Sequence, residues 1–160
     1  MMTSLSNLKS VTLGLATNLR GWKTNRKLVI FESDDWGAMR MPGLEAYRQL
    51  LKSGIRVDRS RYDSLDCLEN RDDLQALMNV IDDHRDVSGR PAIFTLNTVM
   101  GNPDFNAIED DGFECFHHQH FFESYRYYNG EDLEPDWRQA IEAGLIRPQF
   151  HAREHLNSPL

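Results

Sequence analysis

KLVIFES, residues 27–33, is followed directly by DDWG, residues 34–37. The first segment is a run of β-branched, aliphatic and aromatic side chains, which is typical of a strand, and the polar residues and the glycine after it are typical of a strand end. The sequence therefore predicts a buried strand that carries Asp34 and Asp35 at its carboxyl end.

The rest of the chain alternates in the same way between strand and helix patterns. Apolar residues at helical spacing predict helices over 44–52, 72–84 and 135–143, and apolar runs predict strands over 91–99 and 145–150. The polar segment 56–70 is predicted to be a surface loop with a short turn at 62–65. This alternation predicts an α/β fold with a parallel sheet whose functional residues gather beyond the carboxyl ends of the strands. Three strands cannot close a barrel of about eight, so we expect the N-terminal portion of a (β/α) barrel, left incomplete.

We divide the chain into a helical extension, residues 1–26, and the α/β domain, residues 27–160. The extension places Leu5, Leu8 and Leu15 on one side of a short helix. It has no convincing signal-peptide cleavage site, and no segment reaches the roughly 20 apolar residues that a membrane span needs. With only two cysteines as well, we expect a cytoplasmic protein.

Charge also restricts the partners. The 160 residues include 25 acidic and 18 basic side chains, a formal net charge of −7. An acidic protein of this kind is a poor match for nucleic acid or an anionic membrane surface. Neutral or cationic substrates fit better.

HAREH, residues 151–155, follows the last predicted strand and places two histidines four residues apart. On a helical turn such side chains share one face, close enough to bind one metal ion. A carboxylate from Asp34 or Asp35 would complete a two-histidine, one-carboxylate set with open positions, and the other aspartate could act as a base. Taken separately, the aspartates could form a cap or turn, and the histidines could be surface residues. Their shared position at strand ends favours a common metal site.

Three motifs resemble the polysaccharide deacetylase family, in its divergent, deacetylase-like branch: FESDDWG at 31–37, NTVMGNPDF at 97–105 and PQFHAREHLN at 148–157. The resemblance implies a distorted (β/α) barrel that hydrolyses N- or O-acetyl groups of a glycan or sugar conjugate. It also implies that Asp34 is the catalytic base and that Asp35, His151 and His155 hold a divalent metal ion, with zinc as the expected metal. We assign substrate contacts to Trp36, Asn97 and Arg153, with a hydrophobic plug as the alternative for Trp36.

Some family features differ here. Trp36 displaces the usual glycine of the first motif, and Ala152 stands where the family has a hydroxyl. The family's later arginine and histidine have no counterpart before Leu160. The alternative is therefore a truncated, inactive metal-binding or interaction fragment, which could self-associate through exposed strand edges. A metal-dependent hydrolase of non-sugar amides would use the same four site residues.

Overall fold

The computed structural model describes residues 12–14, 16–19, 21–65 and 67–155. The chain groups into two compact units, Met1–Ile30 and Phe31–Leu160. In the first unit, residues 12–14 and 16–18 are helical. The leucines on which the predicted extension rests, Leu5, Leu8 and Leu15, lie outside the described residues.

The second unit contains the α/β elements. Its strands are β1 (Phe31–Trp36), β2 (Phe94–Val99), β3 (Gly101–Pro103), β4 (His118–His120) and β5 (Ile146–Ala152). Its α-helices are α2 (Leu44–Lys52), α3 (Arg61–Leu65), α4 (Arg71–Asp83), α5 (Phe105–Asp110), α6 (Phe121–Ser124) and α7 (Glu134–Glu142). A 3-10 turn, η1 (Val57–Arg59), precedes α3, and a π-helical turn, η2 (Tyr125–Asn129), follows α6.

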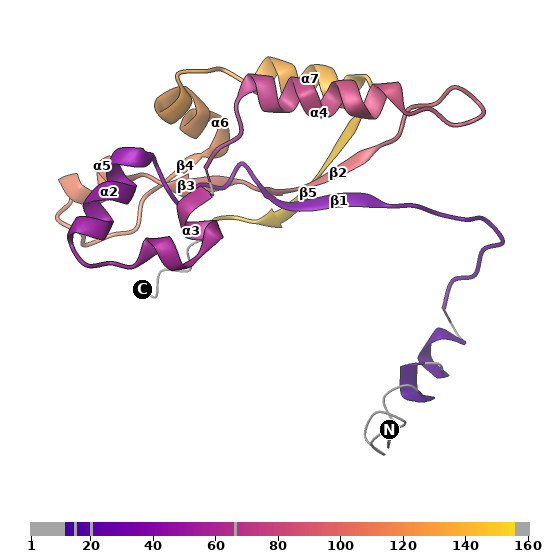
Figure 1. Cartoon of the computed structure of the whole chain (residues 1–160), viewed down its shortest axis with the longest axis horizontal. Coiled ribbons are helices and arrows are strands. Elements are labelled where there is room, and N and C mark those ends of the chain that lie inside the picture. Colours follow the sequence, from indigo (N-terminus) through magenta and orange to yellow (C-terminus); the bar gives the residue numbers. More distant parts are fainter. Residues whose placement is uncertain (1–11, 15, 20, 66, 156–160) are drawn as a thin grey trace. The chain divides into compact units, whose positions relative to one another are not determined.

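The main sheet has three strands in the order β1-β2-β5, and both pairings are parallel. Helices α4 and α7 lie side by side on one face of it (Figure 1). The α/β class with a parallel sheet is thus confirmed, and within the described residues the sheet does not close. Among these residues, moreover, no helix combines the length and the apolar character that crossing a bilayer requires.

The core fills the space between this sheet and its helices. Leu74, Met78 and Ile81 project from α4, whose spacing of apolar residues gives it one buried side. They belong to one cluster with Leu96 of β2 and Trp137 of α7. Because the strands are anchored in this layer, their carboxyl ends are fixed relative to one another.

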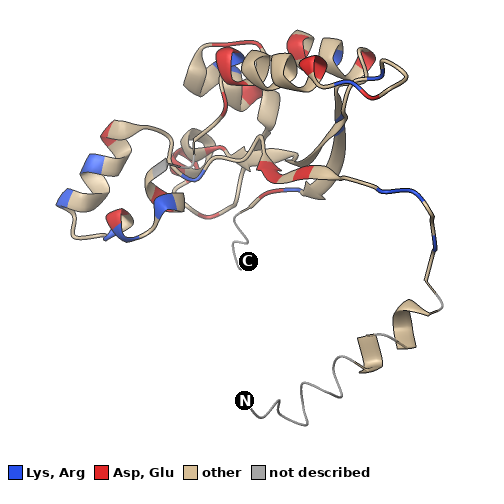
Figure 2. Cartoon of the chain, turned by 45° about the vertical axis from the view of Figure 1, so that its right-hand side comes forward, with Lys and Arg blue, Asp and Glu red and all other residues tan. Residues whose placement is uncertain are grey.

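The three predicted helices, α2, α4 and α7, lie within one residue of their ranges, whereas α5 and α6 were not predicted. The loop prediction for 56–70 was incomplete, because η1 and α3 form there. Strand β1 also differs from its prediction, since it begins at Phe31, and Phe31, its first residue, lies opposite Phe94, the first residue of β2. Residues 27–30 have no ladder partner among the described residues. Figure 2 shows basic residues on the segment before β1 and acidic residues on the strand itself.

The prediction that this first strand is buried was wrong. Phe31 is 50% exposed, and none of the six residues of β1 is fully buried. The reason is the strand order, because β1 is an edge strand and has a neighbour on one side only.

Candidate metal centre

Two β-bulges at the carboxyl end of the sheet turn the predicted ligands toward each other. Between β1 and β2 the register passes from Ser33 opposite Leu96 to Trp36 opposite Thr98, so Asp34 and Asp35 occupy the space of one residue. Between β2 and β5, Thr98 faces Phe150 and Val99 faces Ala152, so His151 is the extra residue. A bulge bends its strand and redirects side chains. The central strand β2 thus has a bulged ligand segment on each side.

The turn after the aspartates is tightly constrained. Asp35 has φ +66°, in the left-handed region, and its carbonyl accepts a hydrogen bond from the amide of Ala38. For residues other than glycine this conformation costs roughly 1 kcal/mol or more, least for Asp and Asn, and it persists where the surrounding structure holds it. The buried amide of Asn102 holds the turn from the other side, since its Oδ1 accepts from the Met39 amide and its Nδ2 donates to the Gly37 carbonyl, both at 2.8 Å.

The side chains of Asp35, His151 and His155 meet at one carboxylate oxygen. Oδ1 of Asp35 lies 3.3 Å from Nε2 of His151 and 2.9 Å from Nε2 of His155. The two histidines do not share a helical turn, as the four-residue spacing had suggested. His151 is in β5 and His155 lies in the irregular segment after it. The end of β5 and the bend after it bring both Nε2 atoms to the same oxygen of Asp35.

Arg40 reaches the same cluster. Its Nη2 donates to Oδ2 of Asp35 at 3.3 Å and lies 2.9 Å from Nε2 of His155. A single ring nitrogen either carries a proton or accepts one. Nε2 of His155 can therefore donate to Asp35 or accept from Arg40, and one of these two contacts stays unfavourable. The Asp35 carboxylate and the His155 imidazole, which are both electron-pair donors, thus face each other beside the positively charged guanidinium of Arg40.

The donor set suits zinc, which binds imidazole nitrogen and carboxylate oxygen. Two ligand atoms of a tetrahedral zinc ion lie about 3.3 Å apart when the bonds are about 2.0 Å long. The separations in the cluster are close to this value. In the part of the chain that the structure describes, no three His, Cys, Asp or Glu side chains are already arranged around a common metal position. Arg40 already contacts Asp35 and His155, so metal binding would require Arg40 to move aside.

Asp34, the predicted base, lies next to this cluster. Its Oδ1 accepts a hydrogen bond of 2.7 Å from Nδ2 of Asn97, which comes from β2. Asn97, predicted to contact substrate, therefore orients Asp34. Both side chains project from the face of the sheet opposite to buried Leu96 and the helices.

The other two predicted substrate contacts are not brought to the cluster. The ring of Trp36 packs edge-on against Phe94 and Trp137 on the core side of the sheet, which is the hydrophobic plug that the sequence left as an alternative. Arg153 is exposed and pairs with its neighbour Glu154. That ion pair raises the pKa of Arg153 and lowers the pKa of the Glu154 carboxyl group.

Sequence reasoning missed a buried pair behind the turn. The hydroxyl group of Tyr125 donates a short hydrogen bond to Oε1 of Glu69. Burial raises the pKa of Glu69 above its ordinary value, although the Tyr125 hydrogen bond and the Gly37 amide act in the opposite direction. Burial and the neighbouring carboxylate raise the pKa of Tyr125 as well. No motif marked these residues, because their pairing depends on two segments 56 residues apart.

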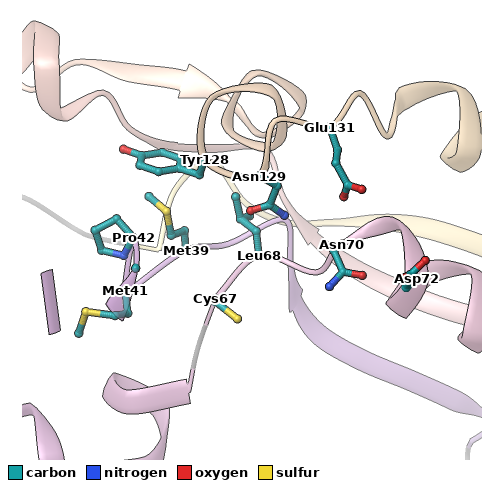
Figure 3. A pocket seen from close by; sticks show the side chains of 11 residues that line it. Met39, Met41, Pro42, Cys67, Leu68, Asn70, Asp72, Tyr128, Asn129 and Glu131 are labelled. Carbon is teal, nitrogen blue, oxygen red and sulfur yellow. The ribbon is translucent and has the colours of Figure 1, made fainter. Parts of the chain in front are cut away.

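The structure also has a cavity of about 490 Å³ beside α4 and η2, shown in Figure 3. Met39, Met41 and Leu68 contribute apolar surface, and Asn70 and Glu131 lie at its rim. None of the predicted site residues lines it. Asn70 caps α4 and Glu131 accepts the Arg71 amide, so these polar groups already have structural roles.

Comparison with protein-family models, with curated proteins and with solved structures finds no match for this chain. A functional interpretation therefore depends on the motifs and on the geometry of the cluster.

Proposed function

We propose that this chain is a metal-dependent hydrolase domain that resembles polysaccharide deacetylases and removes N- or O-acetyl groups from a glycan or sugar conjugate. Asp35, His151 and His155 hold a divalent ion, with zinc as the best fit, and Asp34 is the base. The observation that carries the proposal is the meeting of both Nε2 atoms at Oδ1 of Asp35.

The position of the cluster supports this assignment. In parallel α/β folds the ligands and catalytic groups lie beyond the carboxyl ends of the strands. All four proposed residues lie at or just beyond the carboxyl ends of β1 and β5. In this proposal the sheet is part of a distorted (β/α) barrel, and its polar face is the inner one.

The chemistry follows from the groups present. A bound divalent ion would supply Lewis acidity, lowering the pKa of a coordinated water from about 16 toward about 7. Asp34 takes up the proton of the attacking water and, as the bond to the acetyl carbon breaks, returns it to the departing amine or alcohol. The hydrogen bond from Asn97 keeps its carboxyl group in one orientation. Asp35 and the two imidazoles have no proton-transfer role, since they provide the electron pairs that hold the ion.

A second candidate is a metal-binding or interaction module without catalysis. The openness of the cluster favours it, because the side chains of Asp35, His151 and His155 are 28%, 39% and 33% exposed. Electrostatic stabilisation of a transition state is strongest where water is excluded. A site that only binds a metal ion or a partner does not require water to be excluded.

Acetate release from the zinc-loaded full chain separates the two candidates. The substrates are a chito-oligosaccharide, an O-acetylated xylan and, as the non-sugar amide, an N-acetylated peptide. We expect acetate from at least one of the sugars, and a rate at least about 100-fold lower for Asp34→Asn, which keeps the shape of the base but cannot accept the proton. If the chain binds zinc but releases acetate from none of the substrates, the result supports the metal-binding module. If it releases acetate from the peptide alone, the substrate is a non-sugar amide and not an acetylated sugar.

A further inference from the structure

Four consecutive apolar residues are exposed where the chain enters the sheet. The exposed fractions are 49% for Leu28, 77% for Val29, 74% for Ile30 and 50% for Phe31. Phe31 opens the edge strand β1, and an exposed apolar run that leads into an edge strand is a template for pairing with another strand. The sequence pattern is that of a strand from Lys27 onward, but the ladder begins only at Phe31. Residues 27–30 thus have the sequence pattern of a strand but no ladder partner among the described residues.

We propose that this segment pairs antiparallel with the same segment of a second copy of the chain, so that β1 is lengthened and two three-stranded sheets join into one. This inference is independent of the proposed function. A two-fold axis between identical strands makes each contact twice, which is the commonest form of homodimer.

The two edges of the sheet differ in a way that selects β1. The other edge strand, β5, contains Pro148, which has no amide hydrogen and cannot complete a ladder. Residues 27–36 contain no proline. The edge formed by β1 is therefore the one that can accept a further strand.

Charge and symmetry then fix the register. In a two-fold antiparallel pair, opposing residues lie on the same face, so their numbers add to an even sum. Centring the pair on Val29 places Arg26 opposite Glu32 of the second copy and Leu28 opposite Ile30. Centring it on Ile30 would instead place Leu28 opposite Glu32, an apolar side chain against a charge. Opposite charges directly across a pair of strands stabilise the pairing, so the register centred on Val29 is favoured.

This register leaves Val29 opposite Val29 at the axis, which can be tested by crosslinking. The test uses the full chain with Cys67→Ser and Cys115→Ser, because both native thiols are exposed. Val29→Cys is compared with Val87→Cys, which is also fully accessible but lies outside the proposed pair. With oxidised glutathione, we expect disulfide-linked dimers of the first variant at least about tenfold faster than of the second. Equal rates would overturn the register.

Charge exchange tests the same pair without cysteine chemistry, by sedimentation equilibrium. We expect a dimer of the unmodified chain at about 100 µM, a dissociation constant about tenfold higher for Arg26→Glu or Glu32→Arg alone, and recovery in the double variant. Circular dichroism checks that each variant remains folded. A monomeric unmodified chain, or a double variant as weak as the single ones, would refute the proposal. If the chain binds strands of another protein instead, it stays monomeric alone.

Discussion

Nε2 of His155 lies 2.9 Å from Oδ1 of Asp35, although 120 residues separate them in the chain. This contact joins β1 to the segment that follows β5, and His151 of β5 reaches the same oxygen at 3.3 Å. Each β-bulge moves its ligand segment out of the regular ladder, which is what makes the contact geometrically accessible.

Arg40 should compete with a metal ion. Its guanidinium contacts two of the three proposed ligand groups, so Arg40→Gln removes a positive charge that a divalent ion must displace. We expect Arg40→Gln to bind zinc about tenfold more tightly than the unmodified chain, measured by competition with a chromogenic chelator. Arg48→Gln, an exposed site on α2, makes the same change in charge and should bind zinc like the unmodified chain. Weaker binding by Arg40→Gln would mean that Arg40 organises the ligands.

Asn97 should influence turnover through Asp34. Asn97→Ala removes the 2.7 Å hydrogen bond that orients the proposed base, and we expect kcat for acetate release to fall about tenfold to a hundredfold. The zinc affinity should not change, because Asn97 does not contact the three ligands. Thr95→Ala, two residues earlier on the same face of β2, is the control and should keep kcat within about twofold. A parallel loss of zinc affinity in Asn97→Ala would contradict an orienting role.

Gly37 should tolerate no side chain. It has φ +77°, and a Cβ atom there would lie 2.8 Å from Cδ2 of the buried Phe121 ring. We expect Gly37→Ala to lower the free energy of unfolding by about 2–3 kcal/mol in urea denaturation. Gly54 has a similar φ of +84° with open space around it, so Gly54→Ala measures the conformational strain alone, about 1 kcal/mol. Equal losses in the two variants would mean that the turn moves away from Phe121 without cost.

Glu69 should make the stability depend on pH. Its pKa in the folded protein lies above the ordinary value of 4.5, because burial disfavours the charged carboxylate. Above pH 4.5 the unfolded chain releases this proton first, so the contribution of Glu69 to stability is complete below pH 4.5 and is lost as the pH rises through the folded-state pKa. We therefore expect Glu69→Gln to gain stability relative to the unmodified chain as the pH rises from 4 to 7, measured by urea denaturation. Glu142→Gln, at an exposed position of α7, makes the same change in charge and serves as the control. A constant difference for Glu69→Gln would contradict the raised pKa.

The sequence predicted the ranges of the main helices better than it predicted the order and burial of the strands. Apolar periodicity located α2, α4 and α7 closely. Helices α4 and α7 have one side in the core, whereas α2 has the same spacing without a buried residue. It could not reveal that β1 is an edge strand, since periodicity does not encode strand order. It also treated the four-residue spacing of the histidines as helical, whereas a bulge in β5 and the following bend bring the rings together.

The candidate site was predictable in part for the same reason. Asp34, Asp35 and the histidines stand at strand ends, where sequence position indicates spatial position in a parallel sheet. Arg40 and the Glu69–Tyr125 pair were not predicted, because only the tertiary structure brings these residues to the site. The buried amide of Asn102 ties the turn at Gly37 to Ser124, a contact that only the tertiary structure creates.

Metal content tests the central claim most directly. Untagged protein is dialysed against zinc and then buffer, and its metal is measured by elemental analysis. We expect about one equivalent in the unmodified chain, none in His151→Ala/His155→Ala, and a strong loss in Asp35→Asn, which keeps a residue that tolerates positive φ. His118→Ala/His120→Ala, which removes two other exposed histidines from β4, should keep its metal. An unmodified chain without zinc, or a His151→Ala/His155→Ala variant that retains it, would contradict the account.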